Sequence, residues 1–149
     1  MRKREGFVPV KDVGKYMINM VLLGSLAVID FKKKEIHILI LLPVIAVWLG
    51  ISIWNNNVDF FGIISAVFLV SVSLVTRQAF GMADAIVLSL IGIENGVMYM
   101  LIIFFISDFL FLLFAVLKFG LKQRNKELPF IPFIFTAFIL TKILLREII

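Results

Sequence analysis

Two aspartates stand at the ends of apolar segments, where they could carry out acid–base chemistry together. Asp30 ends the apolar run 16–29, and Asp84 opens the short apolar run 85–93. When two carboxyl groups lie within a few ångströms of each other, charge repulsion raises the pKa of one of them, and the pair shares a proton. The ionised group can then take a proton from water while the protonated group polarises a peptide carbonyl. This is the chemistry of aspartic proteases, with Asp30 and Asp84 as the candidate catalytic residues.

Spacing alone also allows a structural interpretation of the two aspartates. Asp30 could pair with Lys33 or Lys34 at the surface, and Asp84 could cap the helix that it opens. The two interpretations differ in one geometric point, because only the catalytic one requires the two carboxyl groups to meet.

The composition leaves few other chemistries open. The chain contains no cysteine and a single histidine, His37. Thiol catalysis, disulfides and iron–sulfur ligation are excluded, and a zinc site of the usual His/Cys kind cannot be assembled. We therefore expect no metal and no cofactor. The formal net charge of +5 is assigned to loops that meet anionic lipid, since no basic face interleaved with aromatics predicts nucleic-acid binding.

The elements that must position the aspartates are membrane helices. Of the 149 residues, 62% are hydrophobic, and the mean hydropathy is +1.09, whereas a soluble domain has about 45–50% apolar residues. A chain of this length has too little interior to bury the excess, so lipid must cover it. The composition predicts an all-α, polytopic membrane bundle of about six transmembrane helices, forming a single domain over residues 1–149.

The apolar runs place these helices along the chain. Asp84 opens a helix too short to cross a bilayer alone, which a tight turn at 94–96 separates from the next span. Pro129 and Pro132 stand at the start of the last span, where a missing N–H costs least. Residues 1–15 form a basic N-terminal segment. The five full spans are predicted at 12–30, 36–54, 58–75, 97–117 and 128–145.

The basic residues predict how the bundle is oriented. The loops after the spans 12–30, 58–75 and 97–117 carry Lys and Arg, whereas the loops around Asn56 and Asn95 carry neither. By the positive-inside rule the basic loops are cytoplasmic, which puts Asp30 and Asp84 at the cytoplasmic boundary. The segment 1–15 then starts on the opposite side, so it is either exported or lies on the membrane surface.

The sequence around the aspartates resembles the prepilin peptidases, which are membrane aspartyl proteases of the GxGD type. Their second catalytic aspartate follows a Gly-x-Gly motif at the head of a short helix, and this chain has Gly81-Met82-Ala83-Asp84. The Pro129-Phe130-Ile131-Pro132-Phe133 segment is also similar to that family. The resemblance implies a multi-pass protein of the cytoplasmic membrane that cleaves the leader of prepilin-like precursors at the cytoplasmic face. It further implies that Gly81 and Ala83 shape the site through their small size.

The chain departs from the family pattern at three places. Ala83 replaces the second glycine, Ile86 replaces a lysine, and His37-Ile38 replaces a Pro-Asn pair. These differences keep a second interpretation open, in which the chain is a catalytically degenerate homologue that acts as a membrane assembly partner. A third is a small transporter or proton path along Asp30, Asp84 and Asp108, although no inverted repeat is visible in the sequence.

Asp108 lies near the middle of the span 97–117, where an ionisable group is costly and usually faces a partner. Lys142 lies at a similar depth on the following span when both are counted from the helix ends. We expect an intramembrane ion pair between Asp108 and Lys142 that holds the last two helices together. The alternative is that Asp108 is a third acid or a proton relay.

Overall fold

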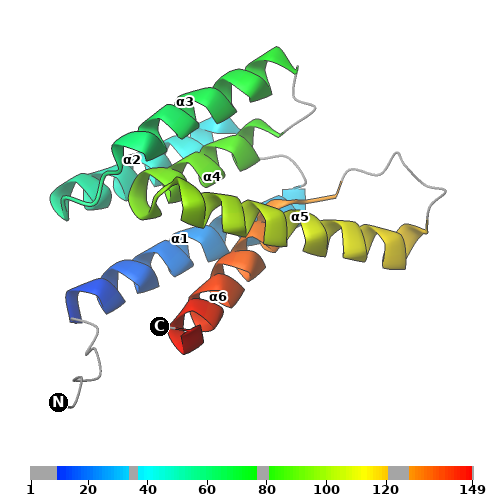
Figure 1. The fold of residues 1–149 in the computed structure, drawn as a ribbon. Coiled ribbons are helices and arrows are strands. Elements are labelled where there is room, and N and C mark those ends of the chain that lie inside the picture. Colours follow the sequence, from blue (N-terminus) through cyan, green and yellow to red (C-terminus); the bar gives the residue numbers. More distant parts are fainter. Residues whose placement is uncertain (1–9, 34–36, 77–80, 121–127, 149) are drawn as a thin grey trace.

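Six α-helices make up the structure, a computed structural model that describes residues 10–33, 37–76, 81–120 and 128–148. Within these ranges there is no β-strand, which confirms the all-α prediction. Residues 1–9 of the basic N-terminal segment lie outside the described residues, and residues 10–15 belong to the first helix. The helices are α1 (Val10–Lys33), α2 (Ile38–Trp54), α3 (Phe60–Val75), α4 (Met82–Asn95), α5 (Val97–Phe119) and α6 (Ile131–Ile148) (Figure 1).

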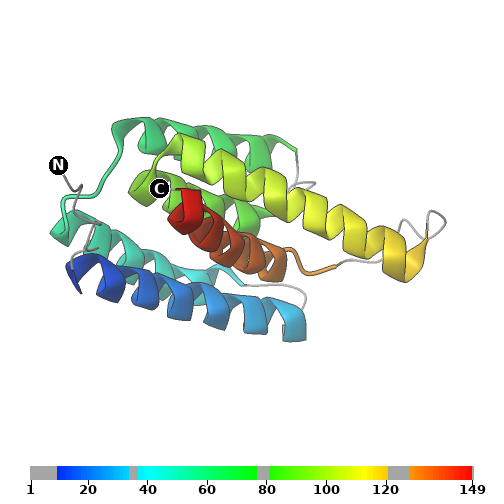
Figure 2. The ribbon, with the colours of Figure 1, turned by 60° about the horizontal axis from the view of Figure 1, so that its bottom comes forward.

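Consecutive helices run in opposite directions, as Figure 2 shows. Helices α1, α3 and α5 end at one end of the bundle, and α2, α4 and α6 begin there. This end, which we call the aspartate end, carries Asp30 near the end of α1 and Asp84 in the first turn of α4. Four of the five links are only one to six residues long, so the chain turns back directly from one helix into the next at each of them.

Helix α4 occupies the centre of the bundle. It contacts α2, α3 and α5, and eight of its 14 residues are buried. Its apolar side chains Val87, Leu88 and Ile91 are fully buried in the common core. A helix this short cannot cross a bilayer alone, but it can be held between longer helices that shield it on all sides.

The boundaries of α4 differ from those predicted. The helix begins at Met82, two residues before Asp84, and it includes Glu94 and Asn95 in its last turn. The predicted turn at 94–96 is therefore reduced to Gly96, which has a φ of 91°. Glycine enters this left-handed region without steric cost, so one residue is enough to reverse the chain into α5.

Helices α3 and α4 touch through their backbones. A Cβ added to Gly62 would overlap the carbonyl group of Gly92, so no larger residue fits at Gly62 without a shift. At the same crossing the backbone N–H of Asp59 donates to the carbonyl of Ile93 across 2.7 Å. Small residues allow this close approach of helices in membrane proteins. The contact fixes the C-terminal half of α4 against α3.

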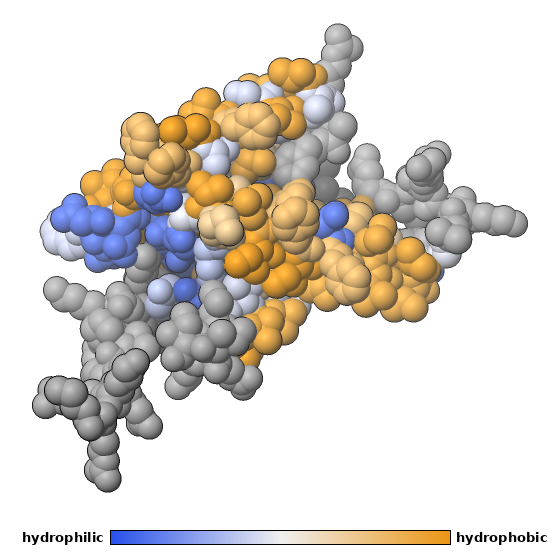
Figure 3. Space-filling view, viewed as in Figure 1, coloured by the Kyte–Doolittle hydropathy of each residue, from blue (hydrophilic) through white to orange (hydrophobic). Residues whose placement is uncertain are grey.

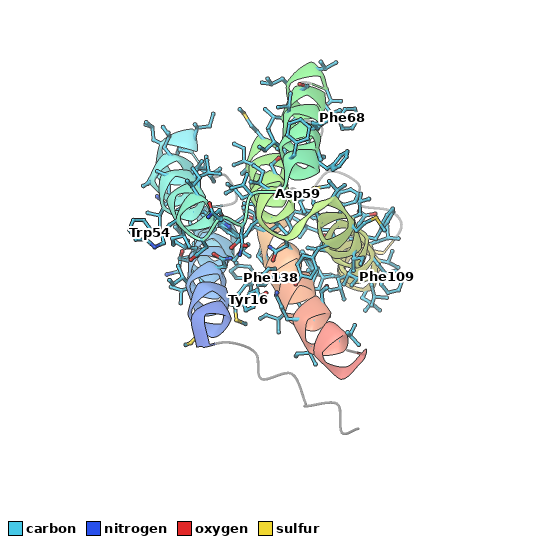
Figure 4. All side chains as sticks on the ribbon, turned by 60° about the vertical axis from the view of Figure 1, so that its left-hand side comes forward. Tyr16, Trp54, Asp59, Phe68, Phe109 and Phe138 are labelled. Carbon is cyan, nitrogen blue, oxygen red and sulfur yellow. The ribbon has the colours of Figure 1, made fainter. Side chains whose placement is uncertain are left out.

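The outer surface of the bundle is largely apolar. Figure 3 shows hydrophobic residues over α3 and α5, and Figure 4 shows Trp54, Phe68 and Phe109 pointing away from the bundle. Phe68 and Phe109 are 66% and 65% exposed. An apolar surface of this extent marks contact with a membrane or a partner.

Within the described residues, one helix segment, Val97–Lys118, is long and apolar enough to cross a membrane by length and composition. Three further apolar helices are shorter, namely Ile38–Trp54, Phe60–Val75 and Ile131–Leu144. The prediction of six helices is thus confirmed, while their number of membrane crossings stays a prediction.

Candidate active site

Asp30 is held by the start of the last helix. Its side chain is 7% exposed, and its Oδ2 accepts a hydrogen bond from the backbone N–H of Ile131 across 3.0 Å. Ile131 is the first residue of α6, where backbone N–H groups have no partner inside the helix and the helix dipole favours a negative charge. The N-terminus of α6 therefore receives the carboxylate of α1.

The Pro129–Phe133 segment explains why this amide is available. The carbonyl of Phe130 accepts hydrogen bonds from the N–H groups of Phe133 and Ile134 at 2.9 and 3.2 Å, which closes the first turn of α6. Pro129 and Pro132 flank Phe130 and Ile131, and a proline has no N–H to offer. The family-like proline pair therefore leaves the two amides between them to face Asp30.

Asp84 lies in the first turn of α4, with its carboxylate folded back over Gly81. A Cβ added to Gly81 would lie 2.5 Å from Oδ2 of Asp84 and 3.3 Å from its Cγ. The backbone of Gly81, with φ −53° and ψ 127°, is accessible to any residue. A larger residue here would displace the Asp84 carboxylate, so glycine serves the space around this carboxylate and not the backbone conformation.

Ala83 and Ile86 both face the packed interior. Each is partly buried and lies against the apolar core. Ala83 thus packs against the core beside Asp84, which agrees with the expectation that its small size shapes the site. Ile86 extends the core at the position where the family pattern has a lysine, so the side chain here brings no positive charge to the aspartates.

The two carboxyl groups interact electrostatically. The pKa of Asp84 is raised to about 7, mainly by burial and to a lesser extent by the negative charge of Asp30. Burial also raises the pKa of Asp30, and the hydrogen bonds from the amides of Ile131 and Phe130 offset part of this rise. Helix α4 is not among the segments apolar and long enough to be a candidate span. Near pH 7 the arrangement thus allows Asp84 to hold a proton, while the amide hydrogen bond at Asp30 favours the charged form of that carboxyl group.

The structure does not bring Asp108 and Lys142 together, although both are among the described residues. The ammonium of Lys142 lies 3.4 Å from the ring centroid of Tyr16 and 5.0 Å from that of Tyr99, and Figure 4 shows Tyr16 on the side of α1 near Phe138 of α6. Asp108 is exposed on α5, nine residues from Tyr99, which is about 14 Å along the helix.

The register of α5 and α6 explains this difference from the predicted ion pair. Phe111 packs edge-on against Phe130, with ring centroids 5.4 Å apart. Helix α5 therefore continues about two turns beyond the start of α6, as Figure 2 also shows. Counting both residues from the helix ends had assumed that the two helices begin and end at the same level.

Three buried polar residues at the opposite end of the bundle were not singled out from the sequence. Asn19, Trp48 and Glu94 come from α1, α2 and α4, and they meet through hydrogen bonds to Glu94. A signal was present, because Asn19 and Glu94 each interrupt an apolar run. The sequence predicts a turn at Glu94, where a carboxylate needs no partner, so the residue type alone does not indicate its burial.

Among the residues that the structure describes, no three His, Asp or Glu side chains gather in a way that could hold a metal ion. The chemistry that the described site can perform is proton transfer between two carboxyl groups, water and a third group.

Comparison with known proteins identifies one related family. A family model described as the type IV leader peptidase family matches residues 17–116, about two thirds of the chain. The match contains both Asp30 and Asp84 and ends before α6. No curated protein and no solved structure gives a significant match.

Proposed function

Because the chain belongs to the type IV leader peptidase family, we propose that it is an aspartic endopeptidase that removes the leader peptide from prepilin-like precursors. The observation that carries the proposal is that Asp30 and Asp84, from two helices distant in sequence, lie at the same end of the bundle, where the charge of Asp30 adds to the raised pKa of Asp84. A pair of carboxyl groups that shares one proton is the catalytic group of aspartic proteases.

The proposed reaction assigns a separate role to each carboxyl group. Asp30, with its carboxylate on the amide of Ile131, takes a proton from the attacking water. Asp84 donates its proton to the peptide carbonyl oxygen as the water oxygen bonds to the carbonyl carbon. The resulting tetrahedral diol then collapses. The C–N bond breaks, the leaving amine takes a proton from Asp30, and Asp84 recovers its proton from the diol.

The proposed substrate is a short basic leader followed by an apolar helix. The helix around the scissile peptide bond must be unwound before cleavage, because a carbonyl inside a helix is held in the i→i−4 hydrogen bond. Gly81 has no side chain beside Asp84, so an extended substrate segment would meet the Asp84 carboxylate there and no side chain of residue 81.

We place the protein in the cytoplasmic membrane as a multi-pass protein with the aspartate end facing the cytoplasm. The exposed apolar surface and the apolar helix Val97–Lys118 support membrane insertion. The last turns of α1 and α5 carry Lys32, Lys33 and Lys118 at the aspartate end, which supports the cytoplasmic orientation.

A second candidate function is a non-catalytic membrane assembly partner. The feature that favours it is Ile86, which brings an apolar side chain to the place of the family lysine. The two candidate functions differ in a single measurable property, which is whether the wild-type protein cleaves a precursor.

Co-expression with a candidate prepilin-like precursor tests the proposal. We expect cleavage with the wild type and no cleavage with Asp30→Asn or Asp84→Asn, at unchanged protein level. Asp59→Asn is the matched control, because Asp59 precedes α3 at the opposite end of the bundle. Cleavage that survives either of the first two changes would remove that residue from the mechanism, and no cleavage by the wild type would favour the assembly partner.

A further inference from the structure

A buried carboxylate joins three helices at the end of the bundle opposite the aspartates. Glu94 is 7% exposed, and its Oε2 accepts hydrogen bonds from Nδ2 of Asn19 and Nε1 of Trp48, both across 2.6 Å. Asn19 and Trp48 are fully buried. We call Asn19, Trp48 and Glu94 the Glu94 cluster. A buried carboxylate is tolerated only where hydrogen bonds replace its water, so these contacts constrain how α1, α2 and α4 can be placed.

The Glu94 cluster sets the relative height of the two aspartates. Asp30 follows Asn19 by eleven residues on α1, and Asp84 precedes Glu94 by ten residues on α4. At a rise of about 1.5 Å per residue, these intervals are about 16.5 and 15 Å long. Because the two helices are antiparallel (Figure 2), the hydrogen bond at one end brings the two carboxyl groups to nearly the same level at the other.

The eleven-residue interval on α1 also determines the direction of Asp30. Eleven residues correspond to about three helical turns, so Asp30 lies within about 20° of Asn19 around the axis of α1. Asn19 faces α4 through its hydrogen bond to Glu94. Asp30 therefore points toward the side on which α4 lies, which agrees with the effect of its charge on Asp84.

The C-terminal end of α4 also contacts α3. The N–H of Asp59 binds the carbonyl of Ile93, and Gly62 lies against the backbone of Gly92. The C-terminal end of α4 is thus fixed by α1 and α2 on one side and by α3 on the other.

We infer that Asn19, Trp48 and Glu94 are positioning residues, which hold Asp84 at the height and distance from Asp30 that peptide hydrolysis requires. The inference rests on the proposed function. None of the three residues touches the reacting atoms, so they act through the placement of α4.

The central test replaces Glu94 in the full chain, in membranes, with a purified precursor as substrate. Glu94→Leu removes both acceptor oxygens, whereas Glu94→Gln keeps one acceptor and the side-chain size. We expect Glu94→Leu to lower kcat roughly tenfold or more at an unchanged KM, because a displacement of about 1 Å is enough for such a loss. Glu94→Gln should restore most of the wild-type kcat.

A second readout does not depend on activity. Because the chain has no cysteine, the double variant Asp30→Cys/Asp84→Cys carries the only two thiols, and a short bis-thiol reagent reports their proximity. In this double-cysteine background we expect cross-linking with the native Glu94 and with Glu94→Gln, and a clear loss of cross-linking with Glu94→Leu. If the wild type cleaves no precursor while this pattern holds, the proposed function fails and the geometric coupling stands.

Trp48→Phe keeps the test decisive if Glu94→Leu does not fold. It removes one N–H donor and keeps an aromatic ring, and Trp54→Phe is its matched control, since Trp54 is 89% exposed. Trp48→Phe should lower kcat and cross-linking, whereas Trp54→Phe should change neither. The inference is overturned if folded Glu94→Leu or Trp48→Phe keeps the wild-type kcat and cross-linking, or if Glu94→Gln is as impaired as Glu94→Leu.

Discussion

The backbone N–H of Ile131 donates to Oδ2 of Asp30 across 3.0 Å, although the two residues are 101 positions apart. This contact makes α6 a part of the candidate active site. It also gives the segment with two prolines a chemical role, because its free amides stabilise the charged form of a buried carboxyl group. The family match ends before this segment, so the role of α6 follows from the structure.

The pH dependence of cleavage should show the state of Asp84. Its pKa lies at about 7 because of burial and, to a lesser extent, the charge of Asp30. As the pH rises through about 7, Asp84 loses its proton, both carboxyl groups are charged, and the carbonyl loses its acid. We therefore expect kcat to fall above pH 7, in assays between pH 5 and 9. A kcat that rises over this whole range would contradict the assignment of Asp84 as the acid.

The same pKa predicts a change in folding stability. The folded-state pKa of Asp84 lies above its ordinary value of 3.8, so between these values the folded state binds a proton that the unfolded state has lost. The contribution of Asp84 to stability therefore decreases as the pH rises from about 4 to 7. Denaturation in detergent should show a larger loss of stability between pH 5 and 8 for the wild type than for Asp84→Asn. Equal losses of stability in the two proteins would show that the pKa of Asp84 is not raised in the folded state.

Gly81→Ala should impair the site without unfolding the bundle. The added Cβ would lie 2.5 Å from Oδ2 of Asp84, so the carboxylate must move. A shift of about 1 Å in a catalytic group can cost on the order of 100-fold in rate, and we expect a loss of this order in kcat. Gly50→Ala on α2 is the control, because nothing lies within 4 Å of its added Cβ. Similar rates for Gly81→Ala and Gly50→Ala would show that Asp84 does not need this space.

Gly62→Ala should destabilise the fold through the crossing of α3 and α4. A Cβ at position 62 would meet the backbone of Gly92, which cannot rotate away as a side chain could. Overpacking of this kind costs about 1–3 kcal/mol. Unfolding in mixed detergent micelles would measure the loss, again beside Gly50→Ala, for which no loss is expected. A Gly62→Ala protein as stable as the wild type would mean that α3 and α4 cross at a greater distance.

A pair of double-mutant cycles should separate the contacts of Lys142. Its ammonium lies over the ring of Tyr16, a cation–π contact of roughly 0.5–2 kcal/mol. We expect a coupling of that size between Lys142→Met and Tyr16→Leu in unfolding measurements. Lys142→Met and Asp108→Asn should instead be additive within about 0.5 kcal/mol, since the two sites are distant. Coupling in the second cycle alone would support the ion pair that the sequence predicted.

Much of the fold could be predicted from the apolar runs. The last five helices begin and end within a few residues of their predicted limits, because polar residues and prolines punctuate the apolar segments. The position of Asp84 near the start of a short helix was also predicted, and it is found in the first turn of α4. Local sequence was sufficient here because each limit depends on neighbouring residues only.

The remaining features depend on distant residues. The hydrogen bond to Asp30 comes from a backbone amide, which every residue but proline carries, so side-chain types contain no signal for it. The placement of Lys142 depends on how far α5 runs past α6, a distance that packing between Phe111 and Phe130 determines. The Glu94 cluster was missed because a single glycine, Gly96, makes the turn and leaves Glu94 inside the helix.

The interval from Asp84 to Glu94 has a consequence for how such chains can diverge. Insertion or deletion of one residue within it would turn the N-terminus of α4 by about 100° relative to Glu94 and move it by about 1.5 Å along the axis. Connecting loops tolerate changes in length at little thermodynamic cost. A change in length inside α4 should therefore abolish the alignment of Asp84 with Asp30, whereas changes in the length of the links outside α4 should leave it intact.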